Sequence, residues 1–296
     1  MSVRVRVHAA ALNFPDLLMT RGGYQFRPEL PYVVGLEGAG EVVSIGAQVD
    51  DVRVGDSVCF RGRSGACAEA CVVSVSDLHP IPAGFEFAEA AGYQIGALTA
   101  YVALVQRGGL QAGETLLVHG ASGGMGLAAV QLGRALGARV IAAGTSAQKL
   151  AVAARCGADE VIDSVPAFRE RVLQLTDGLG ADVIFDPVGG DVFDESTHCI
   201  AWGGRLLVVG FASGRIPDLR ANLPLLKGFS VVGVRAGESG RRDPARGARA
   251  QREIERFAAT GVFRPHIGAR FPLADGVEAL RAMAGRRVAG KIVIEL

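Results

Sequence analysis

The chain has 296 residues, 31 lysines and arginines, 30 aspartates and glutamates, and a formal net charge of +1. This length is sufficient for two domains with a large core. The near-neutral charge gives no electrostatic reason to expect a nucleic acid or an anionic membrane as a partner. The sequence has no uninterrupted apolar run of ~20 residues and no apolar signal-peptide core, so we expect a soluble, cytoplasmic protein.

The first part of the sequence is rich in short β-strands. Glycine and proline turns separate strand-like segments at residues 3–8, 39–45, 57–60 and 69–73. Valine and arginine alternate strictly over residues 3–7, which indicates a strand with one face in water. These short strands predict a barrel-like first domain.

The five cysteines are Cys59, Cys67, Cys71, Cys156 and Cys199. Their odd number and scattered positions suit reduced thiols better than a disulfide framework. The alternative is a zinc site formed by Cys59, Cys67, Cys71 and His79. Their spacing lacks paired C-x2-C ligands, and each lies in an apolar setting, so we expect no metal.

From residue 97 to residue 263, strands alternate with helices. Strands are expected to begin at Thr115, Arg139, Asp159, Ala181 and Arg205, with a further strand at residues 229–234. This alternation predicts an α/β domain with a doubly wound parallel sheet of the Rossmann type. Residues 237–252 are expected to form a solvated loop and the start of a helix. Helices at 253–259 and 275–283 precede a closing strand at 290–296, which is expected to return to the first domain. The predicted domains are therefore residues 1–96, completed by about 264–296, and residues 97–263.

A glycine-rich turn lies between the first strand and first helix of the second domain. Its pattern is Ala121-x-Gly123-x-x-Gly126, a variant of the dinucleotide fingerprint with alanine at the first glycine. A helix N-terminus offers unpaired N–H groups and a partial positive charge, and glycines let a pyrophosphate approach closely. The chain contains 41 glycines, so the strand before the turn and the helix after it carry this prediction.

The sequence contains no Asp or Glu between Glu114 and Asp159. Sites that prefer NAD usually carry an acid after the second strand, where it binds the ribose 2′-hydroxyl. Here Gly144, Thr145 and Ser146 end that strand, and Lys149 follows. A carboxylate ~4 Å from a 2′-phosphate would cost on the order of 4 kcal/mol at an effective dielectric constant near 20. The lack of an acid after this strand favours NADPH over NADH as the cofactor. Taken alone, Lys149 is more simply interpreted as an exposed lysine on a helix surface.

The sequence resembles the zinc-independent branch of the medium-chain dehydrogenase/reductase superfamily, the NADPH:quinone oxidoreductases related to zeta-crystallin. Besides the glycine turn, the matching stretches are VHAAALNFPD at residues 7–16, GLEGAG at 35–40, VGD at 54–56, LTAY at 98–101, DPVGG at 186–190 and GKIV at 290–293. They extend nearly from end to end. The resemblance implies a GroES-like β-barrel domain joined to a Rossmann domain, and a homodimer formed through the last Rossmann strand. Members of the family have opening strands that this sequence lacks, so we expect the barrel without them.

Zinc-dependent relatives have a cysteine where this chain has residues 13–16, and a histidine where it has Leu36. The resemblance therefore implies hydride transfer from NADPH to a quinone or another electron-poor acceptor, without a metal to polarise the substrate. One alternative is an enoyl-thioester or enone reductase on the same scaffold. A non-catalytic NADPH-binding protein is an alternative of another class, and the absence of a basic, aromatic-rich strand argues against RNA binding.

The resemblance also implies a set of site residues. On the nicotinamide and substrate side they are Asn13, Tyr24, Thr99 and Phe211; in the pyrophosphate turn they are Ser122, Gly123, Gly124, Met125 and Gly126; in the 2′-phosphate pocket they are Gly144, Thr145 and Lys149. Asn13 and Tyr24 are the tentative catalytic pair. Asn13 could instead cap the turn that follows it, Tyr24 could be a surface aromatic, and Thr99 and Phe211 could be core residues.

Overall fold

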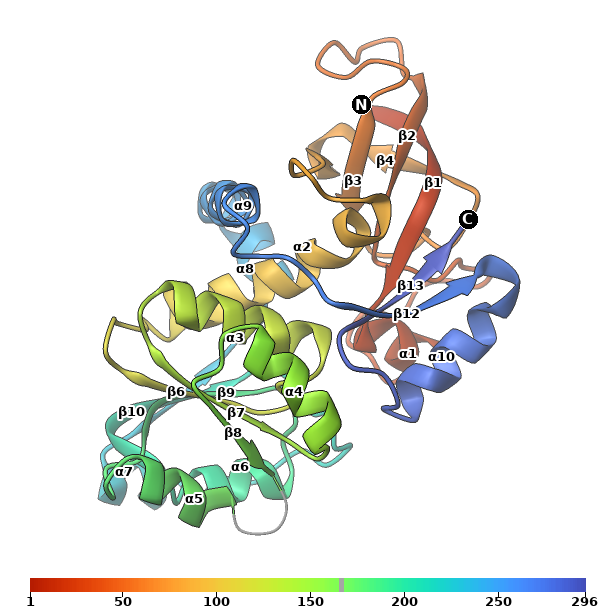
Figure 1. Ribbon diagram of the computed structural model, residues 1–296. Coiled ribbons are helices and arrows are strands. Elements are labelled where there is room, and N and C mark those ends of the chain that lie inside the picture. Colours follow the sequence, from red (N-terminus) through yellow and green to blue (C-terminus); the bar gives the residue numbers. More distant parts are fainter. Residues whose placement is uncertain (165–167) are drawn as a thin grey trace. The chain divides into compact units, whose positions relative to one another are not determined.

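The computed structural model describes residues 1–164 and 168–296 and divides into two compact units. Unit 1 comprises residues 1–95 and 264–296, and unit 2 comprises residues 96–263. Figure 1 shows both units. In the described part of the chain, no helix combines the length and the apolar character needed to cross a membrane.

Unit 1 is built on a seven-stranded sheet. Its strands are β1 (Ser2–Leu12), β2 (Glu37–Ile45), β3 (Ser57–Arg61), β4 (Ala70–Ser74), β5 (Leu78–Pro80), β12 (Ile267–Pro272) and β13 (Lys291–Glu295). The order is β12-β13-β1-β2-β3-β5, and β4 pairs with β1. In β1 the side chains of Val3, Val5 and Val7 are buried and those of Arg4 and Arg6 are exposed, as the alternation predicts. The closing strand β13 pairs with β1, so the C-terminus returns to the first unit.

The helices of unit 1 are α1 (Phe14–Thr20), α10 (Gly276–Ala284) and the first part of α2 (Phe87–Tyr101), with 3₁₀ turns at Val75–Asp77 and Leu273–Asp275. The strand pattern did not predict α1. This helix begins directly after β1, and Pro15 in its first turn needs no intrahelical N–H partner. Its position matters because it carries Asp16 into the interior of unit 1.

Unit 2 is a six-stranded parallel sheet in the order β11-β10-β9-β6-β7-β8. The strands are β6 (Thr115–Val118), β7 (Arg139–Gly144), β8 (Glu160–Asp163), β9 (Ala181–Asp186), β10 (Ile200–Val208) and β11 (Ser230–Gly233). Figure 1 shows α3 (Gly124–Ala135) and α4 (Ala147–Arg155) on one face of this sheet. The opposite face carries α5 (Phe168–Leu175) and α6 (Asp191–Ser196). This is the predicted doubly wound α/β arrangement, and its order reverses between β6 and β9.

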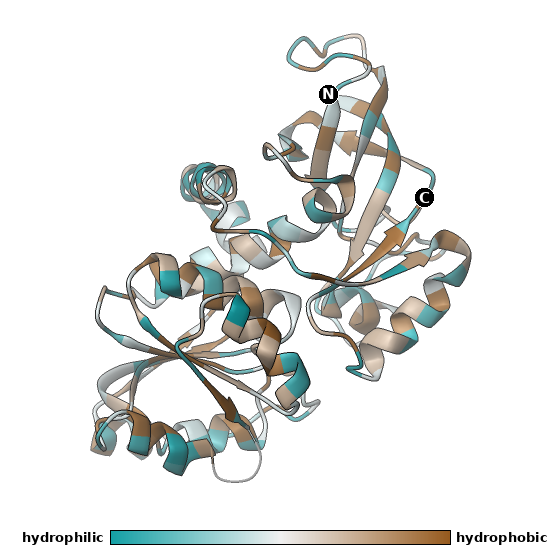
Figure 2. Ribbon diagram, viewed as in Figure 1, coloured by the Kyte–Doolittle hydropathy of each residue, from teal (hydrophilic) through white to brown (hydrophobic). Residues whose placement is uncertain are grey.

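The core of unit 2 explains why its strands are nearly continuous apolar runs. Leu116, Leu117 and Val118 of β6 are fully buried, because helices cover both faces of the sheet. Figure 2 shows the corresponding hydrophobic colouring along the strands. Burial of one such side chain contributes roughly 1.5–3 kcal/mol.

Residues 237–252 were predicted to be a solvated loop and the start of a helix, and the loop part of this prediction is wrong. The structure has α8 (Ala236–Arg242) and α9 (Pro244–Ala259) in this segment. Unit 2 also contains α7 (Asn222–Lys227) and a π-helical stretch, Val102–Arg107, after α2. Alanine and arginine are good helix formers, and Asp243 caps α9 by accepting a hydrogen bond from the Arg246 amide at 2.9 Å. Ala250, Ile254 and Ala258, at intervals of four residues, form the buried side of α9.

Candidate functional site

The turn after β6 leads directly into the N-terminus of α3. Gly120 has a φ of +57°, a conformation that glycine adopts without strain. The Ala121 amide donates to the Ala143 carbonyl of β7 at 3.1 Å, which anchors the turn to the sheet. Gly123 is the N-cap of α3 and provides no side-chain cap. The first-turn amides of α3 therefore lack the usual capping partner and suit an anion.

Two glycines in this turn have different physical roles. A Cβ on Gly126 would lie 2.3 Å from the Gly120 carbonyl oxygen, so the helix packs on the turn only because that side chain is absent. A Cβ on Gly123 would have a single neighbour within 4 Å, the same carbonyl oxygen at 3.4 Å. Protein atoms therefore leave open the space in front of Gly123, beside half-buried Ser122, Gly124 and Met125. This open, amide-lined turn fits a pyrophosphate group.

The carboxyl end of β7 lies beside this turn. Gly144 is buried, Thr145 is exposed and Lys149 is half-buried in the first turn of α4. The Ser146 hydroxyl caps α4 by accepting a hydrogen bond from the Lys149 amide at 3.4 Å. Asp163 of β8 also lies at this edge, because it pairs with Gly144 of β7. The linear sequence did not indicate this acidic residue.

The loops after β9 and β10 form the next part of the same sheet edge. Ala212 and Ser213 donate amide hydrogen bonds to the Pro187 and Val188 carbonyls at 3.0 and 2.9 Å, so the two loops are joined. A Cβ on Gly189 would lie 2.9 Å from the Phe211 ring, which therefore covers this glycine. Phe211 keeps 36% of its surface exposed and is available to a ligand at this edge.

Asp186 is the last residue of β9 and holds the loop that follows it by hydrogen bonds. Its Oδ1 accepts hydrogen bonds from the Val188 and Gly189 amides at 2.8 and 2.9 Å. Its Oδ2 is buried and has no hydrogen-bond partner within the described residues. Burial raises the pKa of Asp186 to about 6, against the lowering effect of the two amides.

His119, at the end of β6, is another polar residue that the sequence analysis did not single out. It is fully buried, and its Nε2 lies 2.8 Å from the Ser196 hydroxyl oxygen of α6. Burial lowers the pKa of His119 to about 3, so its imidazole is neutral at ordinary pH. A neutral histidine with one hydroxyl partner serves here as a packing residue beneath the turn.

The predicted site residues divide between the two units. Thr99 lies half-buried in α2, one turn after Gly96, where a Cβ would lie 3.4 Å from the Gly124 carbonyl oxygen. Unit 2 therefore brings the glycine turn, the β7 end and the Phe211 loop to the carboxyl side of one sheet, and helix α2, which carries Thr99, packs against the start of α3 at Gly96. Asn13 and Tyr24 belong to unit 1, where Tyr24 is half-buried in the segment after α1.

In unit 1, Asn13 joins a buried ion pair. The Lys291 ammonium of β13 donates to Glu37 Oε1 of β2 at 2.6 Å and to Asn13 Oδ1 at 2.8 Å. The Lys291 and Glu37 side chains are 6% and 0% exposed. Asn13 occupies the N-cap position of α1, and its Nδ2 donates to Glu37 Oε1 at 3.0 Å. A lysine at the start of an apolar strand was the available sequence signal for this group.

Asp16 lies close to this ion pair. Its two oxygens accept hydrogen bonds from the Asn13 amide at 2.8 Å and the Gly35 amide at 3.1 Å. Burial raises the pKa of Asp16 to about 7, partly opposed by those amides and by the Lys291 charge. The carboxyl group therefore joins the backbone at the start of α1 to the backbone just before β2.

The cysteines considered as zinc ligands have other surroundings. Cys59 is buried with its sulfur near backbone carbonyls of His79 and Pro80, at 3.6 and 3.5 Å. Burial raises the pKa of Cys67 to about 12 and that of Cys71 to about 11, which disfavours the thiolate that zinc requires. Residues 1–164 and 168–296 contain no cluster of three or more His, Cys, Asp or Glu side chains suited to a metal ion.

Comparison with known proteins places the chain in a family. Residues 1–114 match the model of the alcohol dehydrogenase GroES-like domain, and residues 124–250 match that of the zinc-binding dehydrogenases. The chain is 41% identical, over 99% of its own length and 81% of the relative's, to a quinone oxidoreductase-like protein 2 homolog of Nematostella vectensis.

Two solved structures extend the comparison. The quinone oxidoreductase of Thermus thermophilus, solved alone and in complex with NADPH, is 33% identical with a TM-score of 0.86. That match covers 100% of this chain and 91% of the other. The CurK enoyl reductase is 25% identical with a TM-score of 0.89, covering 99% and 90%. The chain thus belongs to the medium-chain dehydrogenase/reductase family of oxidoreductases, among its quinone oxidoreductase-like members.

Proposed function

We propose that this protein is an NADPH-dependent reductase that transfers hydride to a quinone, or to a similarly electron-poor acceptor, without zinc. The observation that carries the proposal is the carboxyl edge of the unit 2 sheet. At this edge the N-terminus of α3 has no side-chain cap, and the space in front of Gly123 is open. The end of β7 lies next to it, and the loop that follows β7 carries hydroxyl groups and Lys149. The NADPH complex of the Thermus thermophilus relative supports this assignment.

The pyrophosphate would lie against the turn of Ser122, Gly123, Gly124, Met125 and Gly126. The amides at the start of α3 supply hydrogen bonds, and the helix dipole supplies a partial positive charge. Gly144, Thr145 and Lys149 would receive the 2′-phosphate. The ammonium of Lys149 offsets the phosphate charge, and the Thr145 hydroxyl is a donor on the same loop.

Four residues are proposed to contact the nicotinamide or the substrate. Phe211 and Thr99 border the nicotinamide in this assignment, Asn13 offers a carboxamide, and Tyr24 offers a phenol to the substrate. When bound, NADPH supplies the hydride, and the second hydrogen of the reduced acceptor arrives as a proton from water or a hydroxyl. The chain then acts mainly by orienting the ring and excluding water.

The absence of a zinc requirement rests on the residues at the ligand positions of zinc-dependent relatives. The Asn13 side chain hydrogen-bonds Lys291 and Glu37 and is no thiolate, and Leu36 has no metal-binding atom in its side chain. An acceptor that is already electron-poor needs no Lewis acid. Quinones and α,β-unsaturated carbonyls meet this condition, whereas simple alcohols do not.

Stopped-flow absorbance of NADPH, with a simple benzoquinone as acceptor, tests the proposal. We expect NADPH to be consumed in proportion to enzyme, with hydroquinone as product and no effect of a zinc chelator. The likeness to an enoyl reductase makes a crotonyl thioester the second acceptor to try. Saturated thioester without quinone turnover would support that alternative, and no turnover with either acceptor would favour a non-catalytic NADPH-binding protein.

We also propose a homodimer formed through β11. Within residues 1–164 and 168–296, this strand pairs with β10 alone, at the end of the sheet, and its residues are exposed or half-buried. Val231 keeps 37% of its surface exposed on this edge. An exposed, apolar edge strand can pair with its own copy, which hides its unpaired backbone groups.

A further inference from the structure

A cavity of about 510 Å³ lies between helix α9 and the end of α2, and all of its lining residues belong to unit 2. They are Tyr101 of α2, Val105 and Gln106 of the π-helical stretch, and Arg246, Arg249, Arg252 and Glu253 of α9. This volume is within the range of roughly 300–1,000 Å³ that is typical of small-molecule sites. None of these residues belongs to the proposed cofactor site, so the proposed function gives this cavity no role.

Arg246 is held at the cavity by neutral partners. Its Nε donates to Gln106 Oε1 at 2.9 Å, and its Nη2 donates to the Gln106 carbonyl at 2.8 Å. Because both acceptors are uncharged, the positive charge of the guanidinium is not cancelled. A guanidinium has five N–H groups, so three remain for a ligand. Gln106 lies in the π-helical stretch, a rare conformation that is frequently found at functional sites.

Arg249 and Arg252 add two further positive charges. Their spacing of three residues places them on the same side of α9 as Arg246. Both side chains are exposed, and within the described part of the chain neither makes a hydrogen bond or an ion pair. Like charges three residues apart destabilise a helix, so helix stability does not explain this arrangement.

The acidic groups near the cavity do not neutralise these arginines. Glu253 is the one acidic residue among the described lining residues, and its carboxylate lies 2.9 Å from Nη2 of Arg256. Elsewhere in unit 2 arginines have carboxylate partners, as Arg205 has in Glu114 at 2.6 Å. The cavity therefore carries a net positive charge that a bound anion would offset.

Tyr101 gives the cavity a hydrogen-bond donor and an aromatic surface. Burial, followed by the charge of Glu253, raises the pKa of Tyr101 above its ordinary value of 10, so the hydroxyl keeps its proton. The hydroxyl can then donate to an anion. The half-buried ring offers an apolar face to the organic part of a ligand.

We propose that this cavity binds a small phosphorylated organic molecule, with its phosphate on the guanidinium groups of Arg246, Arg249 and Arg252 and its organic part against Tyr101. A phosphate ester carries a charge of about −1.5 to −2 near pH 7, which suits several converging arginines better than a single carboxylate does. Guanidinium groups also bind phosphate oxygens in a bidentate manner. The inference goes beyond the proposed function and does not depend on it.

A solvated basic helix face is the competing explanation. Arg246 has a structural role in either case, because it ties α9 to Gln106. The informative variant therefore leaves Arg246 in place and is Arg249→Gln/Arg252→Gln. Both replaced side chains are exposed and glutamine is a good helix former, so this variant should fold as the wild type does.

The matched control is Arg241→Gln/Arg242→Gln. These two arginines belong to the neighbouring helix α8, and each pairs with Glu238 at 3.0 Å. The control removes the same number of positive charges from the same surface region of the sequence. It should therefore reproduce any effect that depends on net charge alone.

Calorimetric titration with ADP, at physiological salt and with saturating NADP⁺, tests the site. NADP⁺ occupies the proposed cofactor site, and the salt screens weak attraction between exposed charges. We expect the wild type and the control to bind one further ADP per chain. Arg249→Gln/Arg252→Gln should bind ADP at least about tenfold more weakly, because charge-assisted hydrogen bonds are lost. Pyrophosphate should bind more weakly than ADP, and adenosine should not bind.

Each other result has a definite meaning. Absence of ADP binding by the wild type, or unchanged binding by Arg249→Gln/Arg252→Gln, would overturn the inference. Equal weakening by the control would assign the effect to net charge and would overturn it as well. Citrate binding more tightly than pyrophosphate would exclude a phosphate site in favour of a carboxylate site. If the wild type binds ADP through these arginines but does not bind NADP⁺, the proposed function fails and this inference stands.

Discussion

Among single residues, Lys149 carries the most direct test of cofactor choice. Replacing it by alanine would remove the proposed charge-assisted contact to the 2′-phosphate, worth on the order of 2 kcal/mol. We expect the dissociation constant for NADPH to rise about thirtyfold, while that for NADH changes little. Calorimetry with both dinucleotides measures the ratio.

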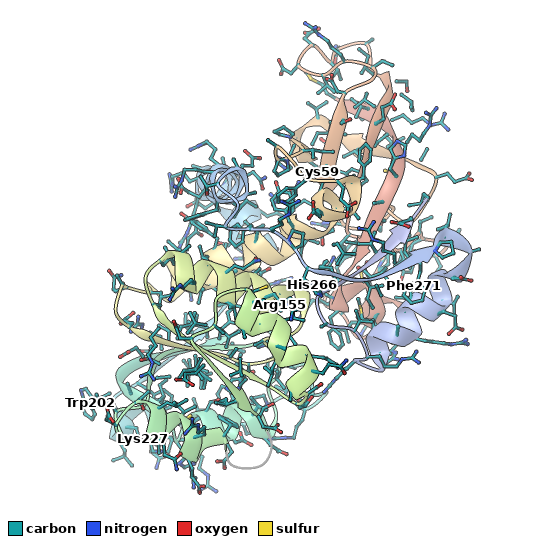
Figure 3. The ribbon with its side chains drawn as sticks, viewed as in Figure 1. Cys59, Arg155, Trp202, Lys227, His266 and Phe271 are labelled. Atoms are coloured by element: carbon teal, nitrogen blue, oxygen red, sulfur yellow. The ribbon has the colours of Figure 1, made fainter. Side chains whose placement is uncertain are left out.

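The matched control is Arg155→Ala, which removes one positive charge from the last turn of the same helix α4. Figure 3 labels this exposed arginine. It should leave both affinities unchanged. Equal weakening of NADPH and NADH binding by Lys149→Ala would mean that the 2′-phosphate pocket lies elsewhere.

Asp186 gives a prediction about stability and pH. Burial raises its native pKa from 3.8 to about 6, so the native state holds the proton more tightly than the unfolded state does. Its contribution is therefore fully present below pH 3.8 and is lost as the pH rises through about 6. The loss amounts to about 3 kcal/mol at most.

Asp186→Asn keeps an oxygen for the Val188 and Gly189 amides but cannot become charged. We expect the variant to be more stable than the wild type near neutral pH, and the difference to vanish towards about pH 4. Urea unfolding at several pH values measures this difference. A difference that is constant with pH would contradict the assigned titration.

Among the structural elements, the turn between β6 and α3 contains one glycine needed for packing, Gly126, and one proposed to face the cofactor, Gly123. In Gly126→Ala the new methyl group would meet backbone atoms of the turn, which cannot rotate away. We expect a loss of roughly 1–3 kcal/mol in the free energy of unfolding, together with loss of cofactor binding. Chemical denaturation and calorimetry measure the two effects.

Gly123→Ala is the informative comparison. Its φ of −80° suits alanine, and its methyl group would reach only the Gly120 oxygen, at 3.4 Å. Stability should therefore change by less than about 1 kcal/mol, the cost of an alanine N-cap. NADPH affinity should nevertheless fall at least tenfold, because the methyl group occupies the phosphate space. Unchanged affinity would exclude this turn as the pyrophosphate site.

Local patterns predicted most elements of the fold. The Val/Arg alternation predicted the buried side of β1, and the alternating apolar strands and helices predicted the parallel sheet of unit 2, although not the order of its strands. Helix α8 and the first part of α9 were missed because arginine-rich sequence was interpreted as solvated loop, whereas the end of α9 coincides with the helix predicted at 253–259. The helix there depends on the Asp243 cap and on three small or apolar residues that pack inward.

The candidate site was predictable only where it is continuous in sequence. The glycine turn and the β7 end could be found because neighbouring residues form them. The Asn13, Glu37 and Lys291 group could not, because Lys291 lies 278 residues from Asn13 and only strand pairing brings them together. Asp163 was missed at the β7 end for the same reason.

At the scale of the whole molecule, the β11 edge predicts a dimer. Light scattering should give twice the 30.7 kDa mass of one chain. Val231→Lys places a charge on this edge and should yield monomers. Val161→Lys is the control, because Val161 is 43% exposed on β8, the opposite edge strand of the same sheet. A monomeric wild type, or an unaffected Val231→Lys dimer, would contradict this assignment.

Exposed apolar residues elsewhere on unit 2 are a second possible dimer interface, which a further variant tests. Trp202 is 80% exposed and lies near Lys227 in Figure 3, and Leu225 and Leu226 of α7 are also exposed. Trp202→Ser should leave the dimer mass unchanged if β11 forms the interface. Dissociation of this variant would instead assign the interface to the region around α7.

The central claim is that the turn from β6 into α3 binds a phosphorylated nicotinamide dinucleotide. Calorimetric titration of the purified wild-type protein with NADPH tests it most directly. We expect saturable binding of one NADPH per chain, much tighter than that of NADH and largely lost in Gly123→Ala. No heat of binding with NADPH, or equal binding by the wild type and Gly123→Ala, would contradict it.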